Sequence, residues 1–282
     1  MKVTVLGTGA VPYLGDWDSP RAGPAHVVSV SGTHVLFDCG KHVTRQLLAA
    51  AIPPAGVSHL FITHAHADHT LDFIHFVYAG WLGGRSRPLD VFGPAGSVEL
   101  VSALFGPAGF FAGDIAGWVS IEPPAHALAP EGIDVRAVEV VTSGLLCQTP
   151  DWSVTATRTE HSPLIDSWAY RLDSAEGSVV VSGDTVPSDA VIDLARDADV
   201  LIHECTATDE ILHAKGFDGY HTSSRQLGRV AAGAGVGTVV LVHFGGNHDS
   251  DAPARLAEMV AEVGESFDGR ILLGEDLLAI DV

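Results

Sequence analysis

Three imidazoles and one carboxylate lie within six consecutive residues of this chain: His64, His66, Asp68 and His69. They follow the apolar run 60–63, which is typical of a buried strand. Because side chains alternate along an extended chain, His64 and His66 should face the same way, whereas Asp68 and His69 should begin the next turn. Imidazole and carboxylate donors suit zinc, iron or manganese. Four donors are too many for one metal with an open position, so the spacing indicates two neighbouring metals.

Three more potential ligands come directly after apolar runs later in the chain. They are His161, Asp184 and His243. A carboxylate at the end of a buried strand can bridge two cations with its two oxygens, although Asp184 could instead cap a helix. His248 competes with His243 for the same role, but it lies in a Gly-Asn loop.

The run from His64 to His69 resembles the HxHxDH signature of the metallo-β-lactamase superfamily. Other segments resemble the branch of that superfamily that contains tRNase Z and a bacterial arylsulfatase, namely 3–9, 21–24, 36–40, 91–94, 203–206, 221–223 and 241–244. The resemblance implies an α+β fold, a four-layer αββα sandwich in which two sheets lie face to face with helices outside. The metal site then lies along one edge of the sandwich and is built from loops.

The resemblance also implies how the ligands divide between two divalent metals. One metal is expected on His64, His66 and His161, and the second on Asp68, His69 and His243, with Asp184 between them. Two zinc ions are favoured, with manganese or iron as alternatives, and no organic cofactor is needed.

Glu204 and His221 are the predicted acid-catalysis pair, and Asp68 joins them among the predicted catalytic residues. In the branch that this chain resembles, a Glu in a His-Glu-x-Thr segment orients a His near the leaving group, and such a His can protonate a leaving alkoxide. The alternatives are a surface carboxylate and a histidine at a helix start. Asp38, which ends a strand, could accept a hydrogen bond from a ligand imidazole or simply form a turn. Cys39 and Cys205 are expected to be small buried hydrophobes.

The composition limits the class of protein. The 282 residues are 46% hydrophobic with a mean hydropathy of +0.26, and we expect one domain spanning residues 1–282. The net charge of −20 and the 15 scattered Lys and Arg residues argue against a nucleic-acid partner. Three cysteines give no disulfide framework, and the apolar region 104–121 is interrupted by proline, aspartate and glycine. A cytoplasmic enzyme without a membrane span is expected, with a homodimer possible.

The elements that must position these residues can be read from the hydrophobic pattern. Strands are predicted at 2–6, 27–30, 34–37, 59–63, 89–92, 134–141, 153–158, 168–172, 178–182, 200–202, 238–242 and 271–273. Helices are predicted at 43–51, 97–104, 189–196, 223–232 and 252–262. The aromatic segments 105–118 and 78–81 could line an apolar pocket, or could belong to the core or a dimer contact.

These observations predict a metal-dependent hydrolase that uses activated water against a small ester, with a phosphodiester first. An arylsulfatase, or a lactonase or other acyl hydrolase, is the alternative within the same chemistry. A tRNase Z-type 3′ endoribonuclease is disfavoured because only 23 residues separate His161 from Asp184, which leaves no room for the tRNA-grasping arm of the bacterial enzyme. An iron-dependent oxidoreductase and a non-catalytic metal-binding protein are the rivals from other classes.

Overall fold

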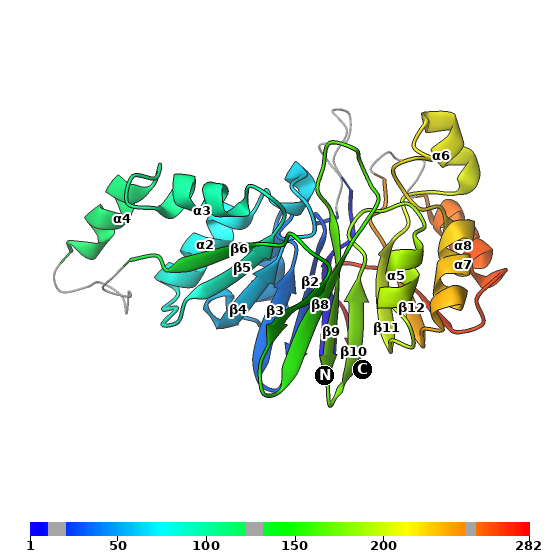
Figure 1. Cartoon of the computed structure of the whole chain (residues 1–282), viewed down its shortest axis with the longest axis horizontal. Helices are drawn as coiled ribbons and strands as arrows, with labels where there is room; N and C mark the ends of the chain where they lie inside the picture. Colours follow the sequence, from blue (N-terminus) through cyan, green and yellow to red (C-terminus); the bar gives the residue numbers. More distant parts are fainter. Residues whose placement is uncertain (11–20, 122–131, 246–251) are drawn as a thin grey trace.

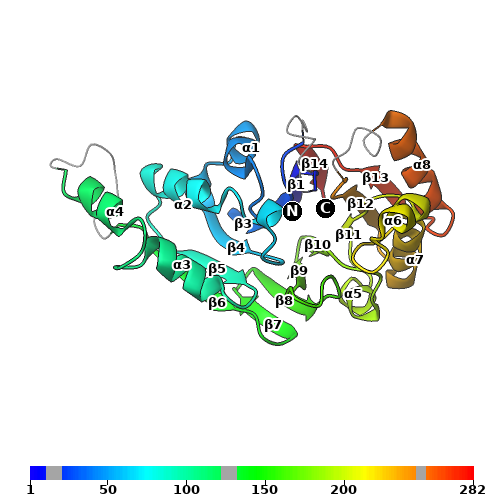
Figure 2. The same ribbon diagram turned by 90° about the horizontal axis from the view of Figure 1, so that it is seen from above.

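A computed structural model describes residues 1–10, 21–121, 132–245 and 252–282 of the chain. Within these residues, two seven-stranded sheets lie face to face and helices cover their outer faces (Figures 1 and 2). This arrangement confirms the predicted α+β sandwich of four layers.

The first sheet holds the N-terminal half of the fold together with the last strand. In spatial order its strands are β14 (Leu278–Asp281), β1 (Lys2–Gly7), β2 (Ala25–Val30), β3 (Thr33–Phe37), β4 (Val57–Phe61), β5 (Leu89–Gly93) and β6 (Val135–Glu139). Strands β3 to β6 are parallel, so their carboxyl ends meet at one edge of the sheet.

The second sheet is formed by the C-terminal half. In spatial order its strands are β13 (Arg270–Leu273), β12 (Thr238–Val242), β11 (Val200–Glu204), β10 (Gly177–Val181), β9 (Trp168–Ser174), β8 (Trp152–Arg158) and β7 (Gly144–Gln148). Strands β10 to β13 are parallel, and β8 runs in the same direction because β9 is antiparallel to both β8 and β10.

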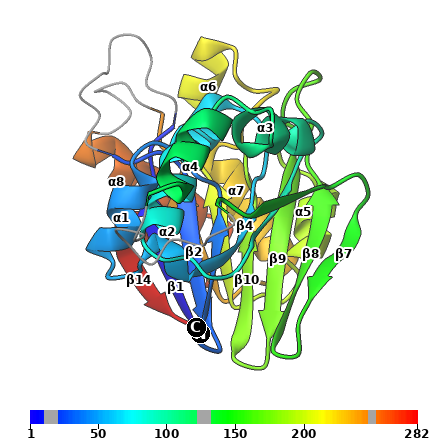
Figure 3. The same ribbon diagram turned by 90° about the vertical axis from the view of Figure 1, so that its left-hand side faces the viewer.

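The helices divide between the two outer faces. Beside the first sheet lie α1 (Val43–Ala49), α2 (Phe73–Leu82), α3 (Ser97–Phe105) and α4 (Ala112–Val119), which are in front of it in Figure 3. Beside the second sheet lie α5 (Asp189–Leu194), α7 (Ser224–Ala234) and α8 (Pro253–Gly264), whereas α6 (Asp209–Lys215) stands above the strand ends (Figure 1). Two 3₁₀ turns complete the described elements, η1 (Pro54–Gly56) and η2 (Ala67–His69). None of the described helices is long and apolar enough to cross a membrane.

Alternation of side chains along the strands explains why three hydrophobic layers form. On β12, Val240 and Val242 belong to the core between the sheets, whereas Val239 and Leu241 face the helices α7 and α8. Both faces of such a strand are buried, which explains its continuous apolar sequence. The edge where its carboxyl end emerges is therefore where polar side chains can first appear.

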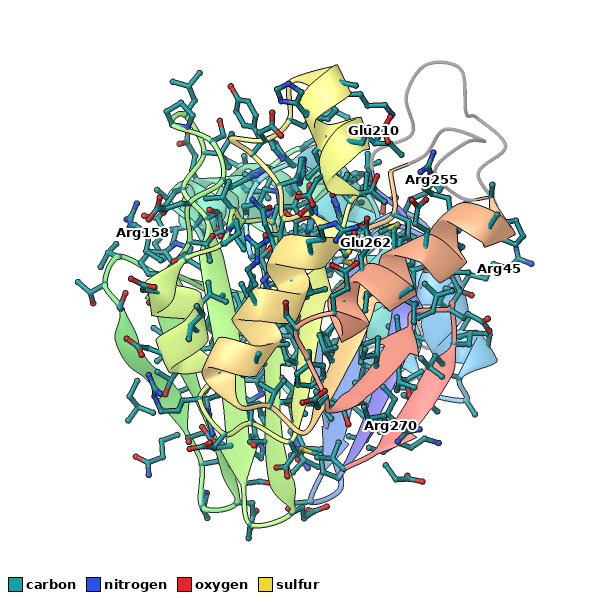
Figure 4. All side chains as sticks on the ribbon, turned by 90° about the vertical axis from the view of Figure 1, so that its right-hand side faces the viewer. Arg45, Arg158, Glu210, Arg255, Glu262 and Arg270 are labelled. Atoms are coloured by element: carbon teal, nitrogen blue, oxygen red, sulfur yellow. The ribbon has the colours of Figure 1, made fainter. Side chains whose placement is uncertain are left out.

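Helices α7 and α8 are joined by a buried carboxylate below the strand ends. Glu262 of α8 lies where the two helices pack (Figure 4), accepting a hydrogen bond from Ser224 Oγ and another from Arg225 Nη2 at 2.9 Å. A capping box of Ser223 and Gln226 begins α7. These contacts fix the point at which the chain enters α7, just after His221.

Five of the described α-helices and strands are missing from our sequence prediction: α2, α4, α6, β7 and β14. The predicted strands and helices all exist, with ends shifted by a few residues. The largest shift is at β4, which covers residues 57–61 where the prediction was 59–63.

Candidate metal centre

All the predicted ligands come from one edge of the sandwich, where strands of both sheets end. His64 follows β4 of the first sheet, and His161, Asp184 and His243 follow β8, β10 and β12 of the second. Because these strands point the same way within their sheets, their exits converge. At the exit of β12, His243 adopts a positive φ of 64°, which turns the chain sharply as the strand ends.

The first donor set consists of three imidazoles. Nδ1 of His66 lies 3.0 Å from Nε2 of His64 and 3.2 Å from Nε2 of His161. Burial, and then the neighbouring His69, lowers the pKa of His64 well below its usual value, so this imidazole is neutral, the form that binds metals. Three ring nitrogens facing one point are the arrangement that a tetrahedral metal with nitrogen ligands requires.

The second donor set consists of Asp68, His69 and His243, which are all buried. Asp68 Oδ2 lies 3.7 Å from His69 Nε2 and 3.4 Å from His243 Nε2. Asp68 and His69 belong to the 3₁₀ turn η2, as the adjacent spacing of the two residues predicted. The turn directs both side chains to a point beside the first set.

Asp184 lies between the two sets. Its Oδ2 is 3.8 Å from Nε2 of His64, and its Oδ1 is 3.4 Å from Nε2 of His69. The carboxylate does not cap a helix, because α5 begins at Asp189 with Ser188 at its N-cap. Asp184 is therefore placed where one carboxylate could contact two cations.

The unpaired atoms of this cluster show that a metal fits there. Several buried donor atoms have no hydrogen-bond partner among the described residues: both carboxylate oxygens of Asp68, Oδ1 of Asp184, and Nε2 of His69 and His243. Such atoms are costly to bury unless something satisfies them. Imidazole and carboxylate lone pairs gathered in this way suit a divalent cation, and the seven residues could hold two.

Asp38 supports the second donor set from behind. Its Oδ2 lies 2.8 Å from Nδ1 of His69, and its two oxygens accept hydrogen bonds from the backbone N–H and hydroxyl of Thr63 at 2.7 and 2.9 Å. This contact fixes the ring so that Nε2 points to the cluster. Of the two readings of Asp38 from the sequence, the structure supports the hydrogen bond to a ligand imidazole.

Glu204 and His221 meet next to the cluster. Nδ1 of His221 lies 3.0 Å from Oε1 of Glu204, which is buried. Burial lowers the pKa of His221, but the charge of Glu204 and its hydrogen bond outweigh burial and raise it to about 9. His221 is not part of a helix, since α7 begins three residues later at Ser224.

A cavity of about 290 Å³ opens beside the cluster. Its described lining consists of Ala10, His66, His161, Ser162, Asp184, Thr206, Phe217, Tyr220, His221, His243 and Gly245. The aromatic segments 78–81 and 105–118 do not contribute to this lining. Tyr78 and Phe105 instead pack against Phe111 on the flank of the first sheet, at ring distances of 5.3 and 6.1 Å, so they do not wall the site as we expected they could.

Sequence reasoning missed four residues of the site. Thr206, Phe217 and Tyr220 line the cavity, and His26 lies buried on β2 beneath the cluster. Burial, followed by the proximity of His69 and His243, lowers the pKa of His26 to about 3. For His26, the signal available in the sequence was a histidine inside the apolar strand β2.

Two cysteines and one further histidine were also considered from the sequence. Cys39 and Cys205 are buried as expected, and burial raises the pKa of both thiols well above the usual value. His248 lies outside the described residues, so His243 is the one of the two that the structure places at the cluster.

Comparisons with known proteins agree with this fold. A family model described as the beta-lactamase superfamily domain matches residues 33–244. The chain is 32% identical over 290 residues to a Ribonuclease Z from Mycobacterium sp. (strain KMS), covering 100% of this chain and 96% of the relative. A Ribonuclease Z from Mycobacterium avium (strain 104) is also 32% identical, over 295 residues, with 100% and 98% covered.

Two solved structures share the fold over nearly the whole chain. The metallo-beta-lactamase fold protein YhfI from Bacillus subtilis has a TM-score of 0.71 at 22% identity, covering 99% of this chain and 98% of its own. The short form of human tRNase Z has a TM-score of 0.71 at 23% identity, with the same coverage. At these identities the likeness concerns the fold alone.

The names of the mycobacterial relatives conflict with our expectation that the chain has no nucleic-acid partner. The alignments also weaken the argument from the missing arm. They run through nearly all of both chains, so these relatives have no long arm that this chain lacks. Since the family model and these relatives match the chain across its sandwich and its ligand segments, the chain belongs to the beta-lactamase superfamily and is a metal-dependent hydrolase with the metallo-β-lactamase fold.

Proposed function

We propose that this chain hydrolyses a small phosphodiester at a centre of two divalent metals, with zinc as the favoured ion. The seven ligands would be His64, His66, Asp68, His69, His161, Asp184 and His243. The observation that carries the proposal is the pairing of Glu204 with His221 beside this cluster, because an alkoxide leaving group needs an acid.

The paired metals, when bound, would lower the pKa of water and neutralise the developing charge on the phosphoryl oxygens. His221 supplies the other half of the reaction. Glu204 holds its Nδ1, which leaves Nε2 to give a proton to the departing oxygen. Asp184 and Asp68 keep the donor sets together from the two sheets.

The charge of the chain supports a small substrate. None of the described residues that line the cavity is Lys or Arg. Figure 4 labels four arginines, Arg45, Arg158, Arg255 and Arg270, which belong to four different elements, α1, β8, α8 and β13. Recognition of a long phosphate backbone rests on clustered cations, which a net charge of −20 opposes.

The second candidate is removal of a 3′ trailer from tRNA. It is favoured by one observation, the 32% identity to proteins named Ribonuclease Z over the whole chain. The two candidates share the chemistry and differ in the size of the substrate.

One assay separates them. Metal-loaded protein is given bis-nitrophenyl phosphate, an aryl sulfate, a lactone and a tRNA precursor with a 3′ trailer, at physiological salt. We expect turnover of the diester and little or no trailer removal. Efficient trailer removal would refute the small-substrate proposal. Activity on the sulfate or lactone alone would keep the two-metal centre and replace the ester, and no hydrolysis of any substrate would refute both candidates.

A further inference from the structure

A single turn connects the predicted acid to one wall of the cavity. Helix α6 ends at Lys215 and is capped by Gly216, whose φ of 70° is in the left-handed region. The N–H of Gly216 bonds to His213 O at 3.1 Å, and the N–H of Phe217 bonds to Leu212 O at 2.9 Å. This pair of bonds is a Schellman motif, which fixes the direction in which the chain leaves the helix.

The other end of the turn is held by the metal centre itself. The backbone oxygen of Tyr220 lies 2.7 Å from Nδ1 of His161, and the N–H of His221 bonds to Phe217 O at 3.2 Å. Residues 216–221 are therefore fixed at both ends. A contact made by this turn inside the cavity would be preorganised, which saves the cost of ordering it on binding.

Two aromatic residues of this turn face the space beside the acid. The ring of Phe217 stands 6.0 Å from that of His221, nearly perpendicular to it at 78°. Tyr220 lines the same cavity and is 42% exposed. They are the only Phe, Tyr or Trp residues among the described lining, so the apolar wall of the cavity lies on the side of the acid.

The position of the wall identifies which part of a substrate it would contact. A general acid stands next to the leaving group. Apart from the acid itself, the described lining holds no Lys or Arg that could pair with a further anionic group there. A cavity of about 290 Å³ lies at the small end of the range for sites that hold small molecules.

We propose that Phe217 and Tyr220 select phosphodiesters whose leaving alcohol carries one aromatic ring, either a phenol or a pyrimidine nucleoside. The proposal rests on the proposed function, because it concerns the leaving group of that reaction. An aromatic side chain can stack on any flat ring, so a phenol and a pyrimidine nucleoside would be bound by the same kind of contact.

The test compares diesters that share a methyl phosphoryl group. One releases phenol, one releases uridine, and one releases a fluorinated aliphatic alcohol with a pKa like that of phenol. In Phe217→Leu and Tyr220→Leu we expect kcat/KM for a ring-bearing diester to fall about tenfold, mainly through KM, and the aliphatic diester to stay within about twofold. The ring-bearing diester whose kcat/KM falls in the variants shows whether the selected leaving group is the phenol or the nucleoside.

Matched variants control for loss of structure. Phe217→Tyr and Tyr220→Phe keep an aromatic ring and should keep the preference for ring-bearing diesters. Phe110→Leu alters a phenylalanine that is 83% exposed and outside the cavity lining, so it should leave all three rates unchanged. An equal fall for ring-bearing and aliphatic diesters in the Leu variants would overturn the proposal.

A binding measurement keeps this inference separate from the proposed function. Phenylphosphonate and butylphosphonate are titrated into metal-loaded wild-type protein and Phe217→Leu by calorimetry. We expect wild-type protein to prefer the phenyl compound by about tenfold, and the variant to lose that preference. If no diester is hydrolysed but wild-type protein still prefers phenylphosphonate, the proposed function is refuted, whereas the role of the aromatic wall in binding is supported. Equal affinity of wild-type protein for the two compounds refutes the wall.

Discussion

Oε1 of Glu204 lies 3.0 Å from Nδ1 of His221, and the same carboxylate reaches a second imidazole through a hydroxyl group. Thr206 Oγ1 donates to Glu204 Oε2 at 2.9 Å and lies 3.2 Å from Nδ1 of His243. The backbone N–H of Thr185 donates to Oε1 at 3.0 Å. One carboxylate that is 1% exposed therefore orients both the candidate acid and a candidate metal ligand.

The first prediction concerns the acid. His221→Ala should retain its metals and lose roughly 10²- to 10⁴-fold in kcat on a phosphodiester with a poor leaving group, the usual range for a general acid. On a nitrophenyl ester the loss should be small, because nitrophenolate hardly needs a proton. Steady-state kinetics on both esters measures the contrast. His213→Ala, on the exposed end of α6, is the matched control, and wild-type rates for His221→Ala on the poor leaving group would contradict the role.

The second prediction concerns Glu204. Glu204→Gln keeps the size of the side chain but removes the charge that favours protonated His221. Turnover of the same ester should fall by about 10- to 100-fold, less than for His221→Ala, and the alkaline limb of the pH–rate profile should move to lower pH. A profile that keeps its wild-type position would show that Glu204 does not act through His221.

Thr206 allows the two contacts of Glu204 to be separated. Thr206→Val removes the hydroxyl between Glu204 and His243 but leaves the contact with His221. It should weaken metal affinity by about tenfold, the low end for supporting residues, and should leave the pH profile unchanged at saturating metal. Metal titrations of the two variants test this division, and a shifted profile in Thr206→Val would contradict it.

The predicted ligands lie together in the structure because the signal that marked them in the sequence is local. Four of the seven predicted ligands, His64, His161, Asp184 and His243, come shortly after apolar strands, and strand order brings them to one edge without any knowledge of loops. The positions of His64, Asp184 and His243 at strand exits could all be read in this way.

What the sequence could not predict depends on contacts between distant residues. Helix α2 has apolar side chains on most sides, so it lacks the period that distinguishes a helix from a strand. Phe217 and Tyr220 belong to a turn whose place is set by Gly216 and by the hydrogen bond to His161, 59 residues away in sequence. For the aromatic segments 78–81 and 105–118 the sequence left a pocket wall and core packing open, because composition does not say which way a side chain points. Their rings pack together away from the cavity lining.

The third prediction concerns metal content. Purified protein should contain close to two equivalents of zinc, manganese or iron, and Asp184→Asn should lose at least one. Chelation should lower the melting temperature, because it leaves buried carboxylates and imidazoles unsatisfied. Elemental analysis and thermal denaturation with and without chelator measure both effects. A single equivalent in wild-type protein would contradict the two-metal centre.

The fourth prediction concerns Asp38, which fixes the ring of His69. Asp38→Asn should weaken metal affinity about 10- to 100-fold, and excess zinc should restore most of the activity. Competition with a chelator of known affinity gives the change directly. If activity is lost while metal affinity stays at the wild-type value, Asp38 acts in some way other than by orienting this ligand.

The last prediction concerns His26, buried beneath the cluster with an unpartnered Nδ1 among the described residues. Its pKa is lowered to about 3 in the folded protein, so the unfolded chain binds a proton there as the pH falls below about 6.5, while the folded chain does not. Stability is therefore lost through this group between about pH 6.5 and pH 3, at up to about 1.4 kcal/mol per pH unit.

The variant His26→Gln has no group that titrates at this position. In metal-free protein its free energy of unfolding should fall less than that of wild-type protein between pH 7 and pH 5, by up to about 2 kcal/mol. His213→Gln, which removes an 85% exposed imidazole instead, is the matched control. Urea denaturation at the two pH values provides the test, and parallel curves for wild-type protein and His26→Gln would refute the assignment.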